Sequence, residues 1–344
     1  MRDSATGARG SPGHPCAVGF DIGGTKIACG VIDGRGGIVE SLPPFPTPGD
    51  QASMIDTLTS VVTELRGRHP LTNAVGVGAA GLINWPEGFV RWAPNNSYRA
   101  MPLRGLLEEA TGLAAVVDND ANVAAWAEAR LGRSADYMMF VTVGTGIGGG
   151  ILLGQRLFRG STGIGAEIGH MIVDPYGGHT CGCGNVGCLE AVASGNALGR
   201  YGQAAAAVDP FGTLVSLAGA AANVTGETVF QAALAGDPTS RSLYARLGNW
   251  LGIGLASLTT LFDLQLIVVG GGVARAGDLL LEPARASLSR YLFADSHRSL
   301  PAVVPATLGV EAGWVGAALL ALDSPVDRSG LRQPGASVGP PRIV

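Results

Sequence analysis

A short pattern that occurs twice limits what this chain can fold into. Each copy consists of an apolar run, a turn of Gly and Thr, and a second apolar run; the copies cover residues 17–32 and 137–153. Apolar runs bounded by such turn residues predict strands joined by tight turns. Because a repeated unit indicates internal duplication, we expect two similar α/β halves that face each other across a cleft. Small ligands commonly bind in such clefts.

Strand and helix patterns alternate along the rest of the chain. Strands are expected at 17–21, 26–32, 38–42, 74–79, 115–118, 137–143 and 150–153, and helices at 51–66, 101–111 and 121–131. The chain has 344 residues, enough for two domains. The predicted domains are a disordered tail at 1–16, a smaller α/β domain at 17–134, a larger α/β domain at 135–310 with a Cys-rich loop at 167–190, and a C-terminal tail at 323–344. A helix near 311–322 is expected to complete the smaller domain.

Charge and hydropathy exclude several classes of function. The net charge is −4 and no long run of Lys or Arg occurs, so nucleic-acid binding is not expected. The longest apolar stretch, Trp250 to Phe262, is shorter than the roughly 20 residues that span a bilayer. The first residues lack the apolar core of a secretion signal. We therefore expect a cytoplasmic protein that binds neither membranes nor nucleic acid.

The first Gly/Thr turn has the sequence Asp21-Ile-Gly23-Gly24-Thr25-Lys26. Paired glycines allow a turn so tight that its amides converge, which suits phosphate oxygens. Asp21 is a candidate for holding Mg²⁺ through water, and the Thr25 hydroxyl is a candidate for binding a phosphate oxygen. A hairpin turn with an incidental aspartate is the alternative interpretation of this motif alone.

The second turn begins with Gly144-Thr145-Gly146 and continues with the Gly-x-x-Gly spacing of a dinucleotide-binding fingerprint. That fingerprint requires a helix to follow, whereas residues 151–154 predict a strand. We therefore interpret this turn as a second phosphate loop that faces the first.

A third glycine cluster, Gly270-Gly271-Gly272, follows an apolar strand at 266–269. Glycines there allow the backbone to approach an adenosine closely. The alternative is an ordinary turn from a strand to a helix.

The segment Asp118-Asn119-Asp120-Ala-Asn122 joins a strand to a helix. One such residue would serve as the helix N-cap, but two carboxylates and two amides exceed what capping needs. The helix dipole favours a charged carboxylate at this place, which suits a base that accepts a proton from a sugar hydroxyl. We assign Asp120 as that base.

Three of the five cysteines, Cys181, Cys183 and Cys188, lie within eight residues. A Cys-x-Cys pair is too close for an unstrained disulfide, whereas three thiolates and one imidazole make a tetrahedral structural zinc site. The imidazole belongs to His170 or to His179. We favour His170, because His179 is only two residues from Cys181 and reaches the metal awkwardly.

Two acids, Glu167 and Glu190, flank the proposed zinc loop. Charged carboxylates accept strong hydrogen bonds from hydroxyl groups. We expect both acids to bind sugar hydroxyls, together with the second ring nitrogen of His170. The alternative is that each acid is a solvated surface charge.

With these motifs, the chain resembles the ROK family of sugar kinases (repressor, open reading frame, kinase), and within it the ATP-dependent glucokinases of actinobacteria. The resemblance covers about residues 17–322 and is carried by the two phosphate loops, the Asn119-Asp120 pair, Glu167-x-x-His170 and the cysteine cluster that ends in Glu190. It implies an actin-like ATPase and sugar-kinase fold, related to ribonuclease H, with two duplicated α/β domains that close over the substrates.

The implied activity is in-line transfer of a phosphoryl group from ATP, with Mg²⁺, to the 6-hydroxyl of glucose, with Asp120 as the base. The implied sugar ligands are Asn95, Asn119, Asp120, Glu167, His170 and Glu190. The implied nucleotide ligands are Asp21, Gly23, Gly24, Thr25, Lys26, Gly144, Thr145, Gly146, Gly270, Gly271 and Gly272. Zn²⁺ would be held by His170, Cys181, Cys183 and Cys188, and the protein would be a homodimer or a homotetramer.

Other functions within this resemblance stay open. The sugar could be another hexose or an N-acetylhexosamine, and polyphosphate could replace ATP. Some relatives are sugar-responsive repressors, but the residues before the first strand are too few and too rich in Gly and Pro for a DNA-binding domain. A sugar-binding protein without catalysis is disfavoured by Asp120 and by the two phosphate loops.

Overall fold

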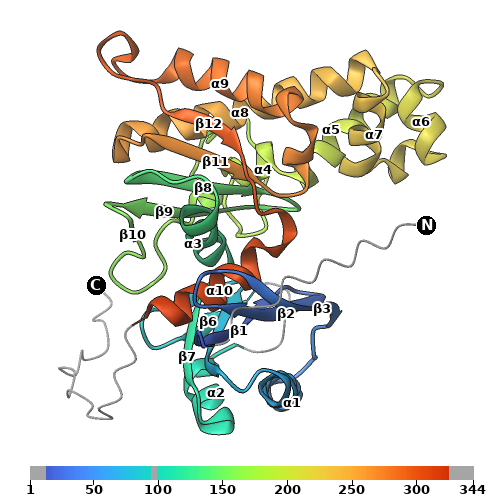
Figure 1. Cartoon of the computed structure of the whole chain (residues 1–344). Coiled ribbons are helices and arrows are strands. Elements are labelled where there is room, and N and C mark those ends of the chain that lie inside the picture. Colours follow the sequence, from blue (N-terminus) through green and yellow to red (C-terminus); the bar gives the residue numbers. More distant parts are fainter. Residues whose placement is uncertain (1–12, 94–98, 325–344) are drawn as a thin grey trace, which may run out of the picture.

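The computed structural model describes residues 13–93 and 99–324, which form two lobes, one above the other in Figure 1. The sheet of the first lobe, drawn below, contains β1 (Cys16–Ile22), β2 (Lys26–Asp33), β3 (Ile38–Pro46), β4 (Thr72–Ala79) and β7 (Ala114–Asn119). The sheet of the second lobe contains β8 (Tyr137–Val143), β9 (Ile147–Leu153), β10 (Arg156–Leu157), β11 (Leu266–Gly270) and β12 (Ala302–Pro305). A small third sheet pairs β5 (Leu82–Asn84) with β6 (Phe89–Trp92).

The two five-stranded sheets have the same topology. Their strand orders are β3-β2-β1-β4-β7 and β10-β9-β8-β11-β12. On one side of the central strand of each sheet lie two strands, each antiparallel to its neighbour. On the other side lie two strands parallel to the central one. The duplicated α/β fold predicted from the repeat is therefore confirmed. The segment after Gly146 is a strand antiparallel to β8, which confirms the rejection of a dinucleotide-binding turn.

Most predicted elements begin and end within a few residues of the observed ones, and the largest differences are at β3 and β9. Strand β9 begins at Ile147 and includes three glycines that resemble a loop in the sequence. A side chain on Gly150 would collide with the backbone of α3 (Asp120–Leu131), so the strand needs glycine there. Strand β3 continues to Pro46, which is possible because β3 is an edge strand.

The helices cover the outer faces of both sheets and also fill the space between them. Helices α1 (Gln51–Arg68) and α2 (Leu103–Thr111) belong to the first lobe. The second lobe carries α4 (Leu189–Ala193), α5 (Gly195–Val208), α6 (Thr213–Ala218), α7 (Gly226–Leu234), α8 (Pro238–Phe262) and α9 (Asp278–Tyr291). Helix α3 and the last helix, α10 (Ala312–Asp323), pack against each other between the two sheets, and α10 contacts β1, β2 and β4 (Figure 1).

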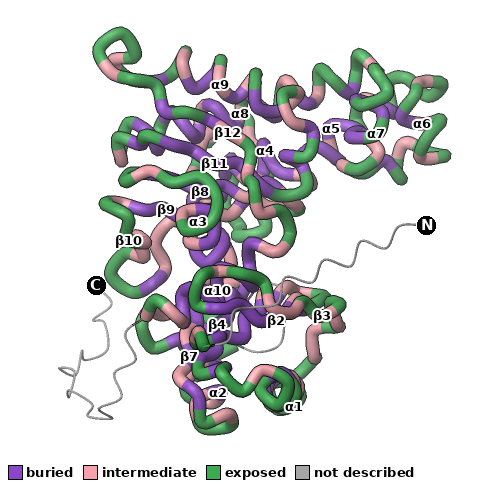
Figure 2. The backbone as a smooth tube through the Cα atoms, viewed as in Figure 1, coloured by how far each residue is buried: buried purple, intermediate pink, exposed green. Residues whose placement is uncertain are grey.

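Both lobes contain buried residues, whose backbone is coloured purple in Figure 2. One cluster, which includes Phe20, fills the first lobe, and another, which includes Leu251, fills the second. A third cluster around Trp314 and Phe140 lies between the sheets, beside α3 and α10. Helix α10 contacts the first sheet, so we propose that it completes the smaller domain at 17–134, next to the larger domain at 135–310. Among the described residues, no helix combines the length and apolar character needed to cross a membrane.

Helix α10 approaches its neighbours so closely that glycine is required at the contacts. A side chain on Gly316 would overlap the carbonyl oxygen of Val123 in α3. The Gly316→Ala variant is therefore expected to lose about 1–3 kcal/mol of unfolding free energy, the usual cost of overpacking. Denaturant unfolding measures this loss.

The control for this variant is Gly105→Ala, at an exposed position of α2 where an added Cβ meets no atom within 4 Å. Alanine favours a helix over glycine by about 1 kcal/mol, so this variant should be as stable as the wild type or more stable. Equal stability of the two variants would contradict the close contact between α10 and α3.

Candidate active site

Three adjoining cavities form one crevice; two of them are lined by both lobes and the third by the second lobe alone. The carboxylate cavity, of about 350 Å³, is lined by Gly81, Leu82, Trp92, Asn119, Asp120, Gly146, Glu167, His170 and Glu190, among others. The central cavity, of about 380 Å³, is lined by Asp21, Asp120, Phe140, Gly271, Gly272 and Gly313, among others. The outer cavity, of about 260 Å³, is lined by Gly144, Thr145, Asn196, Glu227, Phe230, Tyr244 and Arg275, among others.

The cavities share walls, so a single ligand pair can extend through all three. Asp120 lines both the carboxylate and the central cavity. Gly272 and Arg275 line both the central and the outer cavity. Gly144 and Thr145 line both the outer and the carboxylate cavity. Asp120 therefore lies where a group in the carboxylate cavity meets a group in the central cavity.

In the turn from β7 into α3, one residue caps the helix and the next is the proposed base. The side-chain oxygen of Asn119 caps α3 by accepting hydrogen bonds from the N–H groups of Ala121 and Asn122. The Asn119 side-chain N–H₂ donates to the carbonyl of Gly81, at 3.2 Å. The Asp120 carboxylate accepts a hydrogen bond, 2.9 Å long, from the N–H of Ala121. The capping that sequence analysis expected of one residue is thus done by Asn119, and the Asp120 carboxyl faces the cavities.

Three carboxyl groups, those of Asp120, Glu167 and Glu190, line the carboxylate cavity together. Burial raises the pKa of Asp120 above its ordinary value. Burial, followed by the charges of Asp120 and Glu190, raises the pKa of Glu167 to about 7. Acids that crowd one cavity strongly favour partners that donate hydrogen bonds, such as hydroxyl groups.

The second predicted phosphate loop joins β8 to β9 and lies against Glu190. The N–H of Ile147 donates to the Glu190 carboxylate at 2.9 Å, and a side chain on Gly146 would collide with that carboxylate. The carbonyl of Gly144 accepts from the N–H of Gly195 at the start of α5. This loop therefore connects the carboxylate cavity to the outer cavity.

The first predicted phosphate loop is placed differently from the second. Of its residues only Asp21 lines one of the three cavities; Gly23, Gly24, Thr25 and Lys26 line none of them. The N–H of Gly23 donates to the carbonyl of Lys26 and closes a hairpin turn, so that amide is not free for a phosphate. Contact of these four residues with a nucleotide stays a prediction.

The third glycine cluster divides in a similar way. Gly271 and Gly272 line the central cavity, and Gly272 also lines the outer cavity. Gly270 is the last residue of β11 and lies against the ring of Phe140, and its contact with a nucleotide stays a prediction. Asn95, the other predicted sugar ligand, lies outside the described residues.

Asp21 is half-buried and lines the central cavity together with Asp120. Burial, followed by the charge of Asp120, raises the Asp21 pKa to about 7, although Lys26 opposes the shift. An acid with a raised folded-state pKa stabilises the fold at low pH, and this contribution is lost as the pH rises through that pKa. Mg²⁺ prefers carboxylate oxygens and would relieve this repulsion, so Asp21 fits a magnesium site.

The Asp21→Asn variant is therefore expected to lose phosphoryl transfer but to gain stability in the absence of ligands. Its Tm should exceed that of the wild type by a few degrees at about pH 8, and the difference should shrink towards about pH 4. Thermal unfolding across this pH range measures the effect. Asp56→Asn, at an exposed position of α1, serves as the control. A lower Tm for Asp21→Asn at pH 8 would show that the carboxylate is not under electrostatic stress.

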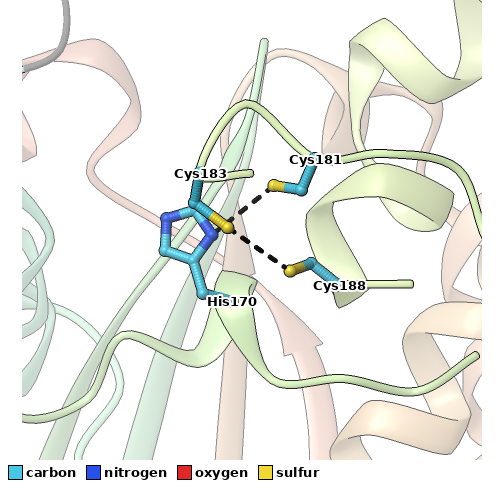
Figure 3. A group of neighbouring side chains, drawn as sticks. All are labelled: His170, Cys181, Cys183 and Cys188. Carbon is cyan, nitrogen blue, oxygen red and sulfur yellow. Dashed lines mark hydrogen bonds between the residues drawn. The ribbon is translucent and has the colours of Figure 1, made fainter. Parts of the chain in front are cut away.

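The proposed zinc ligands come together in space, as Figure 3 shows for His170, Cys181, Cys183 and Cys188. Their ligand atoms all lie within 4.8 Å of one another. His170 Nδ1 lies 3.6 Å from Cys181 Sγ, and Cys183 Sγ lies 3.6 Å from Cys188 Sγ. With metal–sulfur bonds of about 2.3 Å, ligand atoms at the corners of a tetrahedron lie about 3.7 Å apart. The donor set and its spacing therefore fit Zn²⁺.

The fold also distinguishes the two candidate histidines. His170 ends the 3-10 helix η1 (Ile168–His170) and turns one ring nitrogen towards the sulfurs, while the other points away from them (Figure 3). The ring of His179 lies 6.3 Å from that of Tyr201 and outside the cluster. Since His170 also lines the carboxylate cavity, the same side chain belongs to both sites.

Most residues of the outer cavity were not predicted from the sequence. Its walls include the starts of α5 and α7 and side chains from α7, α8 and the 3-10 helix η3 (Val273–Ala276): Gly195, Asn196, Gly226, Glu227, Phe230, Tyr244 and Arg275. The Arg275 guanidinium lies over the Phe230 ring and pairs with Glu227 at 2.6 Å. In the sequence these residues look like ordinary helix starts and core positions, so no local signal singles them out.

The chain is similar to known proteins in both sequence and fold. The ROK family profile matches residues 17–324. The glucokinase of Streptomyces coelicolor is 43% identical over 309 residues, which cover 88% of this chain and 96% of that protein. The N-acetylmannosamine kinase of Escherichia coli is 35% identical over 309 residues, which cover 88% of this chain and 97% of that protein.

A solved structure agrees with these relatives. The crystal structure of a ROK family glucokinase from Streptomyces griseus, in complex with glucose and AMPPNP, has a TM-score of 0.79 and 41% identity, and the match covers 90% of this chain and 100% of that one. The resemblance read from the motifs is confirmed, and the chain belongs to the ROK family.

Proposed function

We propose that this protein is an ATP-dependent glucokinase that phosphorylates the 6-hydroxyl of glucose. The observation that carries the proposal is the place of Asp120, on the wall between a cavity lined by carboxylates and a cavity lined by Asp21, Gly271 and Gly272. The similarity to glucokinases, over most of both chains, supports the same activity.

In this proposal the sugar occupies the carboxylate cavity. Glu167 and Glu190 accept hydrogen bonds from its hydroxyl groups, and His170 adds a ring nitrogen on the side away from the sulfurs. Asn119 holds the turn in place, because both ends of its side chain are already bonded to the backbone. These contacts aim the 6-hydroxyl at the Asp120 carboxylate, and such positioning accounts for much of the rate in phosphoryl transfer.

The nucleotide occupies the other two cavities. Its adenosine lies in the outer cavity, beside Phe230 and Tyr244, and its phosphates lie in the central cavity, beside Asp21 and Gly272. Mg²⁺, held by Asp21, would neutralise charge on the phosphate oxygens. The sugar oxygen forms a bond to the γ-phosphorus, the bond to the β-phosphate oxygen breaks, and Asp120 accepts the hydroxyl proton. Burial raises the pKa of Asp120, which makes it a stronger base than an ordinary aspartate.

The zinc cluster has a structural role in this proposal. All four ligand positions are filled by protein atoms, so none is open for a substrate. The metal would hold together the loop whose two ends carry Glu167 and Glu190.

A phosphorylation screen tests the proposal. Purified protein is incubated with ATP and Mg²⁺ and with glucose, mannose, fructose, allose or N-acetylmannosamine, and ADP release and the sugar phosphate are measured. We expect the highest kcat/KM with glucose, and a lower rate when polyphosphate replaces ATP. A preference for N-acetylmannosamine would favour the alternative of an N-acetylhexosamine kinase, which similarity to such a kinase supports. Absence of any sugar phosphate would contradict a kinase.

Two further parts of the proposal concern the protein in the cell. A cytoplasmic location is proposed because the reaction needs a supply of ATP. A homodimer or a homotetramer is proposed from the resemblance, and the molar mass from light scattering, compared with 34.8 kDa for one chain, tests it.

A further inference from the structure

A buried ion pair lies directly behind the proposed base and joins the two lobes. The Arg159 guanidinium donates from Nε to a carboxylate oxygen of Asp118 at 2.7 Å. The side chain of Asp118 is 1% exposed and that of Arg159 is 14% exposed. Asp118 belongs to β7 of the first lobe, whereas Arg159 follows β10 of the second lobe. Neither residue lines any of the three cavities.

Asp118 organises the turn that carries Asp120. One carboxylate oxygen accepts from the N–H of Asn119 at 2.8 Å and from the side-chain N–H₂ of Asn122 at 2.9 Å. The other oxygen is the one that Arg159 binds. Asp118 thus holds residues on both sides of the base, and Arg159 fixes the orientation of the Asp118 carboxylate.

Arg159 is itself held in place from two further directions. Its guanidinium lies over the ring of Trp85, 3.6 Å from the ring centre. The N–H of Trp85 donates to the carbonyl of Thr162, so the loop after Arg159 is also attached to the first lobe. The carbonyl of Arg159 accepts from the N–H of Gly165 at 2.8 Å, which closes the loop just before Glu167. One residue therefore contacts the turn of the base and the loop that leads to a sugar-binding acid.

We propose that Arg159 is a positioning residue that couples the base turn at 118–122 to the acidic loop at 159–170. This inference rests on the proposed kinase function. Arg159 contacts no substrate; it sets the distance between the Asp120 carboxylate and the carboxylate of Glu167, which lie on different lobes. Correct placement of the sugar hydroxyl against the base depends on that distance.

A contribution to stability alone is the weaker explanation for this pair. Removing two charges from water costs about as much as their attraction returns, so a buried ion pair adds little net stability. Its value lies in a defined geometry, and the planar guanidinium of arginine supplies such geometry by binding a carboxylate and stacking on a ring at the same time. Lysine would retain the charge but lose the planar contacts.

The test is a kinetic comparison of Arg159→Gln, Arg159→Lys, Asp118→Asn and the double variant Asp118→Asn/Arg159→Gln. A displacement of about 1 Å at a reacting group can cost a hundredfold in rate. We expect Arg159→Gln to lower kcat at least about tenfold and to raise the KM for glucose, with the KM for ATP within about twofold of the wild type. Arg159→Lys should recover part of the lost kcat. The double variant should lose no more than the worse single variant, because the two residues act as a pair.

Arg285→Gln is the matched control. Arg285 in α9 also makes ion pairs, with Asp278 and Glu282, and binds the carbonyl of Val303, but it lines none of the three cavities. This variant should lower the Tm and leave kcat unchanged. If Arg159→Gln lowers the Tm in the same way and all of its kinetic constants stay within twofold of the wild type, the proposal is overturned.

Two other outcomes are also decisive. If Arg159→Gln does not fold, Arg159→Lys replaces it: a lowered kcat at nearly unchanged Tm supports the proposal, and an unchanged kcat overturns it. A wild-type protein that phosphorylates no sugar contradicts the proposed function and, with it, this inference. An active wild type with fully active Arg159 variants contradicts this inference alone.

Discussion

The Asp120→Asn variant is expected to lose kcat by about a hundredfold to ten thousandfold, the usual contribution of a positioned general base. Asparagine has nearly the same shape as aspartate and can still accept the hydrogen bond from Ala121, so the turn into α3 should persist. It cannot accept the proton that the sugar hydroxyl must release. The affinity for glucose, measured by calorimetry, should change by less than about tenfold, because Glu167 and Glu190 still line the cavity.

Asp136→Asn is the control for this variant, because Asp136 pairs with Gln155 at an exposed place outside the three cavities. It should retain wild-type kcat. The pH profile adds a second criterion. Since burial raises the pKa of Asp120, wild-type kcat should fall on acidification at a higher pH than an ordinary aspartate would give. Wild-type kcat in Asp120→Asn would mean that another group is the base.

Loss of zinc is expected to weaken the binding of the sugar and to leave the binding of the nucleotide unchanged. The wild type should contain about one zinc per chain, and Cys183→Ala should contain almost none, since three ligands hold a structural zinc poorly. Cys183 is the exposed thiol of the cluster, so its removal leaves the smallest packing defect. The KM for glucose should rise about tenfold or more, because the loop that carries Glu167, His170 and Glu190 is no longer fixed. The KM for ATP should change by less than twofold.

Metal analysis, thermal unfolding and steady-state kinetics measure these effects together. Cys16→Ala is the control, since Cys16 lies at the start of β1 and outside the cluster. It should keep its zinc and its KM for glucose. A chelator should reproduce the Cys183→Ala values in the wild type and have no further effect on the variant. A zinc-free protein with an unchanged KM for glucose would show that the metal does not hold the sugar-binding loop in place.

The elements up to residue 153, the strand at 266–269 and the last helix could be predicted, because they depend on residues close together in the chain. The repeat predicted the duplicated sheets, and the spacing of Cys181, Cys183 and Cys188 predicted a metal cluster. Local patterns in the sequence do not distinguish a glycine that packs against a neighbouring group from a glycine that lines a cavity. Gly270 packs against Phe140, and the N–H of Gly23 bonds within a hairpin turn. Neither glycine lines the three cavities, so their contact with a nucleotide stays a prediction.

Contacts between distant segments could not be predicted from any local pattern. The choice between His170 and His179 depended on where η1 and the loop at 178–187 pack, and the ring of His179 lies near Tyr201. The outer cavity gathers residues from α5, α7, α8 and η3, which are ordinary helices in the sequence.

By itself, the sequence determined the two α/β halves, the turn that carries Asp120 and the three cysteines suited to zinc, because hydrophobic periodicity, turn geometry and ligand spacing act over a few residues. Only the tertiary structure decided that Asp120 lies on the wall between two cavities, and that Arg159 reaches Asp118, 41 positions earlier in the chain. The physical reason is that these contacts arise from the packing of one lobe against the other. That packing depends on close approaches such as the one at Gly316, between α10 and α3.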